Sequence, residues 1–221
     1  MQYVKIKDAI VEQIDAGMLM PRQKLPAERK LAESFDTTRV TLREALSLLE
    51  AEGKIYREDR RGWFISPAPL RYDPTQTLNF TNMALAQNRI ANKQATRLLK
   101  LKPFSDVYRV DRVRYLDNRP VVYVTNYIRP ELFPNLLDFD LSQSLTDLYR
   151  EHYATQYQTI HYRISTSSLL GEMAQALRAT SGTPAMVERV NYNQKGELID
   201  CDIEYWRHDA ITIESIAELK R

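Results

Sequence analysis

Glycine is scarce in this sequence, and the few glycines are widely spaced. The chain of 221 residues contains six of them, and the two closest in sequence, Gly53 and Gly62, are nine residues apart. The phosphate-binding P-loop and the dinucleotide-binding fingerprint both need clustered glycines, because the backbone must approach a phosphate closely. The sequence therefore excludes both of these nucleotide sites.

Cysteine is almost absent, and so are long hydrophobic runs. The single Cys201 excludes a disulfide framework and suits a reducing compartment. We expect it to be a buried, inert thiol, because it lies on the apolar face of an alternating segment. The three histidines, His152, His161 and His208, lack the spacing of metal ligands. No stretch approaches the roughly 20 apolar residues of a membrane span, and no apolar signal region opens the chain. We predict a cytoplasmic protein without metal or cofactor.

An excess of either charge is also missing. The chain has 31 Lys and Arg against 29 Asp and Glu, a net charge of +2. Residues 1–66 alone hold 12 basic and 11 acidic side chains. Composition therefore gives no indication of nucleic-acid binding. Any contact with DNA would depend on a few well-placed basic side chains, with weak non-specific affinity.

Three prolines divide the chain into two parts that differ in period. Pro67, Pro69 and Pro74 predict a linker, because proline stops helices and central strands. Apolar residues recur at helical spacing before the linker, whereas strand-like runs follow it. We predict a domain at 1–66, a linker at 67–76, a second domain at 77–221, and an α+β fold with an antiparallel sheet. The expected elements of the second domain are strands at 107–115, 121–128, 185–192 and 198–207, and helices at 76–86, 144–152 and 168–179.

The N-terminal part has the pattern of three short helices followed by a β-hairpin. In the third helix, Arg39 and Arg43 are four residues apart and share the side opposite an apolar face. Thr38 can cap this helix through its side-chain oxygen. A short helix with two arginines near its start suits the major groove of DNA, which is about 12 Å wide. Arg60 and Arg61 at the hairpin tip would lie beside the DNA backbone or minor groove.

Segments 25–32 and 38–46, followed by Gly53 and Gly62, resemble the winged helix-turn-helix of the GntR family of bacterial transcription regulators. Arg22 replaces a usual glycine, and we expect a solvated loop arginine there, with a phosphate contact as the alternative. Ala27 replaces a usual helix-capping serine. The predicted DNA-binding residues, from this resemblance and from the helix and hairpin above, are Arg29, Thr38, Arg39, Thr41, Arg43, Arg60, Arg61 and Gly62. The alternative for the hairpin tip is a solvated turn, with its arginines paired to Glu58 and Asp59.

Six short pieces of the second part occur in a characteristic order, at 111–115, 118–120, 126–128, 144–149, 182–184 and 206–209. They resemble the UTRA effector domain of the HutC subfamily, whose fold is similar to that of chorismate lyase. Family members bind a small effector between sheet and helices, so the resemblance implies a pocket in this part. The predicted effector-binding residues are Phe80, Thr81, Arg112, Arg114, Thr125, Ser144, Thr146, Asp200, Glu204 and Trp206.

Opposite charges in this set predict the kind of ligand. Arg112 and Arg114 are two residues apart, so they share one strand face and offer two planar guanidiniums to a phosphate, phosphonate or carboxylate. Ser144, at a helix start, would add a hydroxyl and free amides to the same anion. The alternating acidic residues and Trp206 of the last strand would receive an ammonium group. This pattern favours a short zwitterion, such as an aminoalkylphosphonate or an amino acid. The alternative is a solvated sheet face on which the arginines and acids pair structurally.

We therefore predict a ligand-responsive transcription regulator that is a repressor. We expect it to act as a homodimer on palindromic operator DNA, because one recognition helix covers only a few base pairs. Its effector would act through the proline-rich linker. A competing interpretation is an enzyme of chorismate-lyase-like fold fused to a DNA-binding head. No acid and base stand out by motif, so no catalytic residue is predicted. A third interpretation is an architectural DNA binder without an effector.

Overall fold

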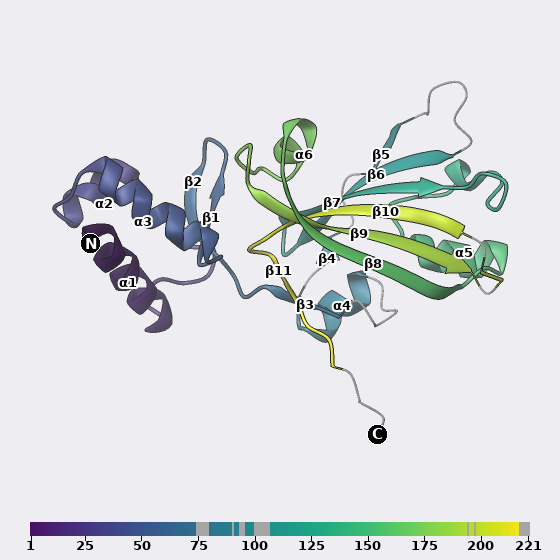
Figure 1. Ribbon diagram of the computed structural model, residues 1–221, viewed down its shortest axis with the longest axis horizontal. Helices are drawn as coiled ribbons and strands as arrows, with labels where there is room; N and C mark the ends of the chain where they lie inside the picture. Colours follow the sequence, from purple (N-terminus) through teal and green to yellow (C-terminus); the bar gives the residue numbers. More distant parts are fainter. Residues whose placement is uncertain are drawn as a thin grey trace.

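Helices and strands form two parts that lie side by side along the long axis of the molecule (Figure 1). The structure is a computed structural model that describes residues 1–73, 80–89, 91–92, 96–99, 107–193, 195–196 and 198–216. Three helices and a hairpin make up the first part, and a seven-stranded sheet with helices on it makes up the second. This arrangement confirms the predicted α+β fold class. Within these ranges, no helix is long and apolar enough to cross a membrane.

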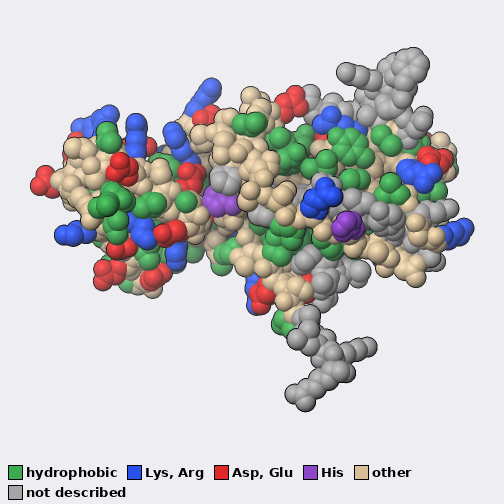
Figure 2. Space-filling view, in the orientation of Figure 1, with side chains coloured by type: hydrophobic (Ala, Val, Ile, Leu, Met, Phe, Trp, Pro, Cys, Tyr) green, Lys and Arg blue, Asp and Glu red, His purple; other side chains and the backbone are tan. Residues whose placement is uncertain are grey.

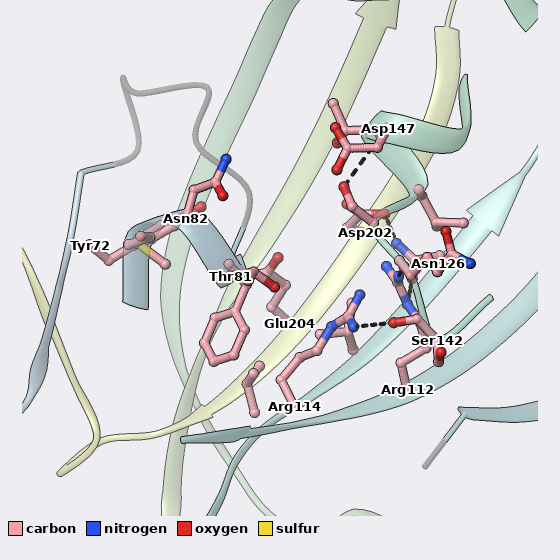
Figure 3. A pocket seen from close by; sticks show the side chains of 18 of the residues that line it. Tyr72, Thr81, Asn82, Arg112, Arg114, Asn126, Ser142, Asp147, Asp202 and Glu204 are labelled. Atoms are coloured by element: carbon pink, nitrogen blue, oxygen red, sulfur yellow. Dashed lines mark hydrogen bonds between the residues drawn. The ribbon is translucent and has the colours of Figure 1, made fainter. Parts of the chain in front are cut away.

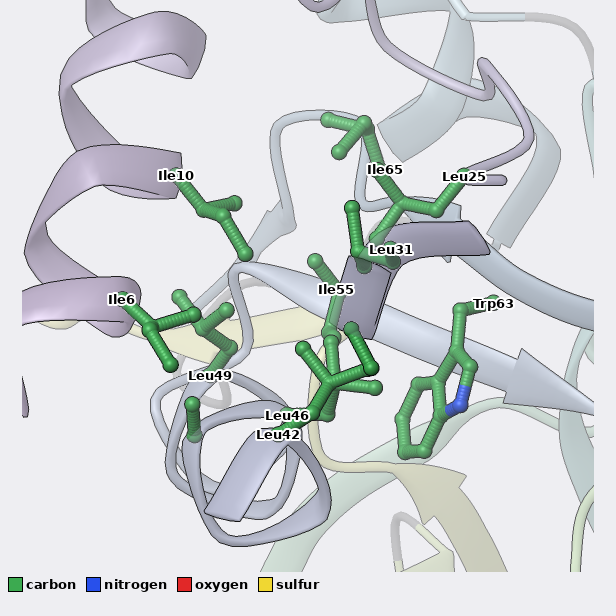
Figure 4. Packing of buried hydrophobic residues seen from close by; sticks show 12 residues of the cluster. Ile6, Ile10, Leu25, Leu31, Leu42, Leu46, Leu49, Ile55, Trp63 and Ile65 are labelled. Atoms are coloured by element: carbon green, nitrogen blue, oxygen red, sulfur yellow. The ribbon is translucent and has the colours of Figure 1, made fainter. Parts of the chain in front are cut away.

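The first part is built around one hydrophobic core. Its elements are α1 (Gln2–Asp15), α2 (Glu28–Ser34), α3 (Arg39–Ala51), β1 (Ile55–Glu58) and β2 (Gly62–Ile65). Leu42, Leu46 and Leu49 recur at steps of three and four, so they share one side of α3, where all three are fully buried. They pack against Ile10 of α1 and Ile55 of β1 (Figure 4). Burying each such side chain contributes about 1.5–3 kcal/mol, which fixes α3 with its other side outward.

The sheet of the second part runs β4-β6-β7-β10-β9-β8, with β5 also paired to β6, and every pairing is antiparallel. Its strands are β4 (Ala91–Asn92), β5 (Thr96–Leu99), β6 (Tyr108–Leu116), β7 (Arg119–Ile128), β8 (Tyr157–Ser168), β9 (Pro184–Asn193) and β10 (Leu198–Arg207). The chain turns between β6 and β7 at Asp117 and Asn118, both with positive φ. Two-residue turns of this kind match the twist of paired strands and favour Asp and Asn.

Helices cover both faces of the sheet. They are α4 (Phe80–Ala86), α5 (Leu145–Tyr153) and α6 (Gly171–Ala176), with a short 3-10 helix at Leu136–Asp138. Met83 of α4 packs with Val122 and Val124 of β7, while α5 packs over the far end of the same face. Tyr123 lies between these valines in sequence and packs with α6 on the opposite face. The face under α4 and α5 therefore has space between its two covering helices.

Several elements differ from the predicted ones. The strand β3 (Leu70–Tyr72) lies inside the predicted linker 67–76 and pairs in parallel with β11 (Ile211–Ile213). The helix α6 occupies only the centre of the predicted segment 168–179. Of the predicted helix 76–86, residues 76–79 lie outside the described residues. The long strand β8 has no counterpart among the predicted elements.

Candidate functional site

The exposed side of α3 forms the first candidate surface. Lys and Arg side chains project along the upper edge of the first part in Figure 2, over α2, α3 and the tip of the β1–β2 hairpin, whereas side chains of both charges lie below. Arg39 and Thr41 are exposed or half-exposed on this edge, and the side chain of Arg43 is 65% exposed. The predicted cap is present, because the Thr41 amide donates to Thr38 Oγ1 at 3.2 Å. Near-neutral composition thus coexists with one basic edge.

Glu28 orients the best-held arginine of this surface. Arg43 Nε donates to Glu28 Oε2 at 2.8 Å, and Trp63 Nε1 donates to Glu28 Oε1 at 3.2 Å. Partial burial raises the pKa of Glu28, but the hydrogen bonds from Arg43 and Trp63 outweigh it and hold the pKa below its usual value. The carboxylate therefore stays charged and links α2, α3 and β2. The neighbouring Arg29 pairs with Glu33 at 3.0 Å on the exposed side of α2.

The hairpin tip carries two arginines in different settings. The side chain of Arg60 is 93% exposed, with its Nε 3.6 Å from Asp59 Oδ2. Arg61 pairs with the nearly buried carboxylate of Glu58. These contacts match the predicted alternative of paired turn residues, yet Arg60 still projects fully into solvent. Gly62, at φ +99°, permits the backbone turn that an L side chain would rarely adopt.

A buried cluster of charges joins the two parts of the chain. Arg119, at the start of β7, pairs with Asp209 at 2.5 Å, and its guanidinium carbon lies 3.5 Å from the ring centre of Tyr56 on β1. Arg207, at the end of β10, donates to the carbonyls of Arg57 at 3.1 Å and Leu177 at 3.0 Å. Burial raises the pKa of Asp209, but Arg119 and Arg207 outweigh it and hold the pKa below its usual value. We call Tyr56, Arg119, Arg207 and Asp209 the junction cluster.

Further contacts reinforce this boundary. His208 Nε2 lies 2.6 Å from the carbonyl oxygen of Glu50, and the Asp59 amide donates to the carbonyl of Arg178 at 3.1 Å. Arg22, expected as a solvated loop residue, instead pairs with Asp117 of the β6–β7 turn at 2.6 Å. The sequence could not predict this ion pair, because Asp117 comes from a distant segment that no local pattern places beside residue 22.

A pocket of about 340 Å³ lies between α4, α5 and the sheet. Eight of the ten predicted effector residues line it: Phe80, Thr81, Arg112, Arg114, Ser144, Thr146, Glu204 and Trp206. Trp206 closes one end, with its ring centre 6.0 Å from that of Phe80 and 6.0 Å from that of Tyr72. The pocket thus combines an aromatic end with a strongly polar wall, of which Figure 3 shows Arg112, Arg114, Asp202 and Glu204.

Two guanidiniums dominate one side of the pocket. Arg112 Nε donates to Asn126 Oδ1 at 2.8 Å and Nη1 to the Gln143 carbonyl at 3.3 Å, while Arg114 Nη1 donates to the Ser142 carbonyl at 3.0 Å (Figure 3). Within the described part of the chain, neither arginine has a carboxylate within ion-pair distance. Burial lowers the pKa of Arg112, and burial together with Arg112 lowers that of Arg114 to about 9. Asp202 and Glu204 act on both arginines in the opposite direction, but neither forms an ion pair with them. Because arginine stays charged at neutral pH, this side holds two positive charges without a direct carboxylate partner.

Carboxylates form the other wall. Asp202 and Glu204 come from β10, and Asp147 and Glu151 from α5. Asp202 accepts a hydrogen bond from Asn126 Nδ2, and Glu204 accepts one from Trp206 Nε1 at 2.8 Å. The start of α5 faces the same space, because Ser144, Leu145 and Thr146 line it, and Ser144 Oγ accepts from the Asp147 amide at 3.3 Å. Positive and negative groups therefore face one cavity, with Asn126 linking them.

Two predicted effector residues lie elsewhere. Thr125 points away from the pocket and donates to Asp111 Oδ1 at 2.6 Å, because alternation along β7 turns its neighbour Asn126 inward instead. Asp200 lies on the pocket face of β10 but is covered by α5, where it accepts hydrogen bonds from Tyr149 at 3.1 Å and Tyr157 at 2.7 Å. Cys201, expected to be buried, is only half-buried.

The structure adds pocket residues that the sequence patterns missed. They are Tyr72, Asn126, Ser142, Gln143, Asp147, Glu151 and Tyr157. Strand alternation could have predicted Asn126, because it lies on the same face of β7 as Val122 and Val124. The others depend on how α5, β3 and β8 dock, which no local pattern specifies. No three His, Cys, Asp or Glu side chains among the described residues are placed to hold a metal.

Comparison with known proteins supplies the family context. The family described as "Bacterial regulatory proteins, gntR family" matches residues 2–65, and the UTRA domain family matches residues 81–212. The chain is 29% identical to the HTH-type transcriptional regulator YihL of Escherichia coli over 94% of each chain. It is 25% identical to the HTH-type transcriptional repressor NagR of Bacillus subtilis, covering 95% of this chain and 92% of NagR. The crystal structure of PhnF from Mycobacterium smegmatis has the same fold, with a TM-score of 0.64 at 24% identity, over 97% of this chain and all of PhnF.

Proposed function

Because this chain belongs to the GntR family and carries a UTRA domain, it is a transcription regulator and not an enzyme, and we propose that it is a repressor controlled by a small anionic ligand. Regulators of this family bind DNA through the helix-turn-helix and effectors through the UTRA domain. NagR is named a repressor, which supports repression here. We further propose that the protein works in the cytoplasm as a homodimer on a palindromic operator, since paired heads match two half-sites.

The proposed DNA contacts come from the basic edge. Arg39, Thr41 and Arg43 at the start of α3 would enter the major groove, and Arg60 at the exposed hairpin tip would reach the backbone or minor groove. Thr38 would act by capping α3 and Gly62 by shaping the tip. Arg29 and Arg61 would exchange their carboxylate partners Glu33 and Glu58 for phosphates.

The proposed ligand site rests on the buried Arg112 and the half-buried Arg114, neither of which has an ion-paired carboxylate among the described residues. A phosphate, phosphonate or carboxylate between Arg112, Arg114 and the start of α5 would neutralise charge that burial makes costly. An ammonium group on the same molecule would lie toward Asp202 and Glu204. We therefore propose a short zwitterion, in which an anionic group and an amine are joined by a few atoms. The observation that carries the proposal is the pair of arginines that faces a cavity of about 340 Å³ without an ion-paired carboxylate.

We propose that β10 relays occupancy of the pocket to the DNA-binding part. Asp202, Glu204 and Trp206 contribute to the pocket, and Arg207 follows directly and holds the Arg57 carbonyl. A ligand that binds Asp202 and Glu204 would shift this strand, and with it Arg207 of the junction cluster. This route supplements the predicted effect through the linker. Coupling requires that the ligand bind one arrangement of the two parts more tightly than another.

The ligand proposal is tested with 2-aminoethylphosphonate as the probe. We expect isothermal titration calorimetry to detect binding to the native protein and a loss of at least about tenfold in affinity for Arg112→Ala, equivalent to about 1.4 kcal/mol. Arg109→Ala is the matched control, because Arg109 lies on the same strand and pairs with Asp111 at 3.2 Å outside the pocket. Equal affinity in all three proteins, or binding to none of them, would rule out this ligand at this site.

A further inference from the structure

A second hollow of the surface lies where the tip of the β1–β2 hairpin meets α6. It is a groove of about 750 Å³ that shares no lining residue with the pocket between α4 and α5. One wall is the hairpin tip, residues 59–61, and the other is α6 with the segment that follows it, residues 178–181. Figure 1 shows the hairpin tip and α6 on the same upper side of the molecule as α2 and α3. The groove therefore continues the basic edge of the first part into the second part.

Positive side chains come from both walls of this groove. Arg60 and Arg61 belong to the hairpin tip and Arg178 to the segment after α6, whereas Asp59 is the only acidic residue among the described ones that line the groove. The side chain of Arg60 is almost fully exposed. Arg178 is also exposed, and its guanidinium has no ion-pair or hydrogen-bond partner among the described residues. Even with Arg61 paired to Glu58, the groove carries an excess of positive charge and suits an anion.

Both exposed arginines of the groove have a left-handed backbone conformation. The angle φ is +59° at Arg60 and +51° at Arg178. Arg178 directly follows Leu177, which caps the end of α6, and glycine is the usual residue at such a position because it has no Cβ. The fold therefore gives no reason for an arginine here. A long, charged and unpaired side chain in a conformation that disfavours it points to a partner outside the chain.

Hydrogen bonds hold the two walls of the groove together. The Asp59 amide of the hairpin tip donates to the Arg178 carbonyl at 3.1 Å. The buried guanidinium of Arg207 donates to a carbonyl behind each wall, that of Arg57 at 3.1 Å and that of Leu177 at 3.0 Å. The arginines of both walls are thus presented as one surface. An extended anion can contact both walls without first ordering either of them, which favours binding.

We infer that this groove holds a stretch of the DNA backbone, and that Arg178 of the second part contacts phosphate there together with Arg60, an inference that rests on the DNA contacts proposed above. The groove and α3 lie on opposite sides of the hairpin (Figure 1). A duplex with α3 in its major groove and Arg60 at the adjacent minor groove therefore brings the next stretch of backbone over the groove. Regularly spaced phosphates match cations on both walls. The DNA-binding surface then extends beyond the helix-turn-helix.

Arg178→Gly removes the contact and keeps the fold, because glycine fits the left-handed backbone better than arginine. On a duplex selected from a random DNA pool, we expect fluorescence anisotropy to show binding about threefold weaker than that of the native protein. The plot of log affinity against log salt concentration should be shallower by about one for each bound head. An unrelated duplex should lose affinity by the same factor, because a phosphate contact carries no sequence information.

Two further variants serve as controls for this experiment. Arg178→Lys keeps a positive charge that can contact phosphate, so its affinity and salt dependence should stay close to the native values. Arg150→Ala removes a half-exposed arginine of α5 that pairs with Asp147, and it should change neither value. Thermal unfolding of Arg178→Gly should occur at or above the native temperature, which separates the loss of a DNA contact from damage to the fold.

Native affinity and native salt dependence in Arg178→Gly would overturn the contact. So would a loss restricted to the selected duplex, or an equal loss in Arg178→Lys together with a lower unfolding temperature. Arg43→Ala separates the groove from α3: if it weakens DNA binding while Arg178→Gly does not, α3 binds DNA and the groove does not. A native protein that binds neither duplex would refute the proposed DNA binding itself, and the groove contact with it.

Discussion

At the scale of single residues, Glu28 holds the exposed side chain of Arg43 in one orientation. The carboxylate takes only the Nε hydrogen of Arg43 and is itself fixed by Trp63. The side chain remains 65% exposed, so its terminal nitrogens are available as a planar fork. Such a fork matches the two acceptors of a guanine edge or a phosphate. A pre-oriented arginine loses less conformational freedom on binding DNA than a mobile one would.

This arrangement predicts a clear effect of Arg43→Ala on operator binding. If Arg43 reads a base, the substitution should cost about 1–3 kcal/mol and relax the sequence preference at one position. Fluorescence anisotropy on a duplex selected from a random DNA pool measures both effects. Arg150→Ala is the control, because Arg150 is half-exposed on α5 and pairs with Asp147 at 2.7 Å, far from α3 in the sequence. Unchanged affinity and preference in Arg43→Ala would remove it from the interface.

Single residues also show which parts of the pocket could be predicted from the sequence. The spacing of Arg112 and Arg114 correctly predicts a shared strand face, because alternation is a local property. The same rule applied to β7 selects Asn126, and the family pattern that pointed to Thr125 was misleading here. Asp200 obeys the alternation yet is covered by Tyr149 and Tyr157. Which polar residue a helix covers depends on tertiary packing, so the sequence alone could not separate Asp200 from Asp202.

At the scale of elements, β10 reverses the expected burial of its two faces. Its apolar residues Cys201, Ile203 and Tyr205 are half-buried, whereas Asp200 and Asp202 are buried. The acidic face turns inward because hydrogen bonds from tyrosines and Asn126 satisfy it. Hairpins and amphipathic helices were predictable from local periodicity. The strand β8 was not, since its polar, uncovered sequence carries no burial pattern to read.

The junction cluster at the end of β10 leads us to predict that the two parts of the chain unfold together. Asp209→Asn would leave Arg119 and Arg207 buried without a carboxylate, a change that typically costs about 3–5 kcal/mol. We expect differential scanning calorimetry to show one unfolding transition for the native chain and two for Asp209→Asn. Glu131→Gln is the control, because Glu131 pairs with Arg129 on the exposed surface, where such pairs contribute little to stability. A single transition merely shifted in Asp209→Asn would contradict the role of the junction cluster.

The carboxylate of Asp209 also determines how the stability of the folded chain changes with pH. Its pKa is below the usual value of 3.8 in the folded chain. Its stabilisation is therefore complete above the unfolded pKa and is lost as pH falls through the folded pKa. The native chain should lose more stability on acidification below pH about 4 than Asp209→Asn does. A slope in Asp209→Asn as steep as in the native chain would assign the acid sensitivity to other carboxylates.

At the scale of the whole molecule, two surfaces have separate proposed tasks. We propose that the basic edge of α3 and the hairpin tip contact DNA and that the pocket between α4 and α5 binds a ligand. The junction cluster and β10 connect these two surfaces, so a change in the pocket has a covalent and hydrogen-bonded path to the DNA-binding part. Part of the predicted linker 67–76 is regular structure, because β3 lies within it and pairs with β11.

The most direct measurement is the affinity of the dimer for a selected palindromic duplex, by fluorescence anisotropy, with and without saturating 2-aminoethylphosphonate. We predict that the ligand weakens DNA binding by the native protein by at least about tenfold, or 1.4 kcal/mol of coupling, and leaves Arg112→Ala unaffected. A native protein that binds the ligand by calorimetry, yet binds the duplex equally tightly with and without it, would contradict the control of DNA binding through the pocket.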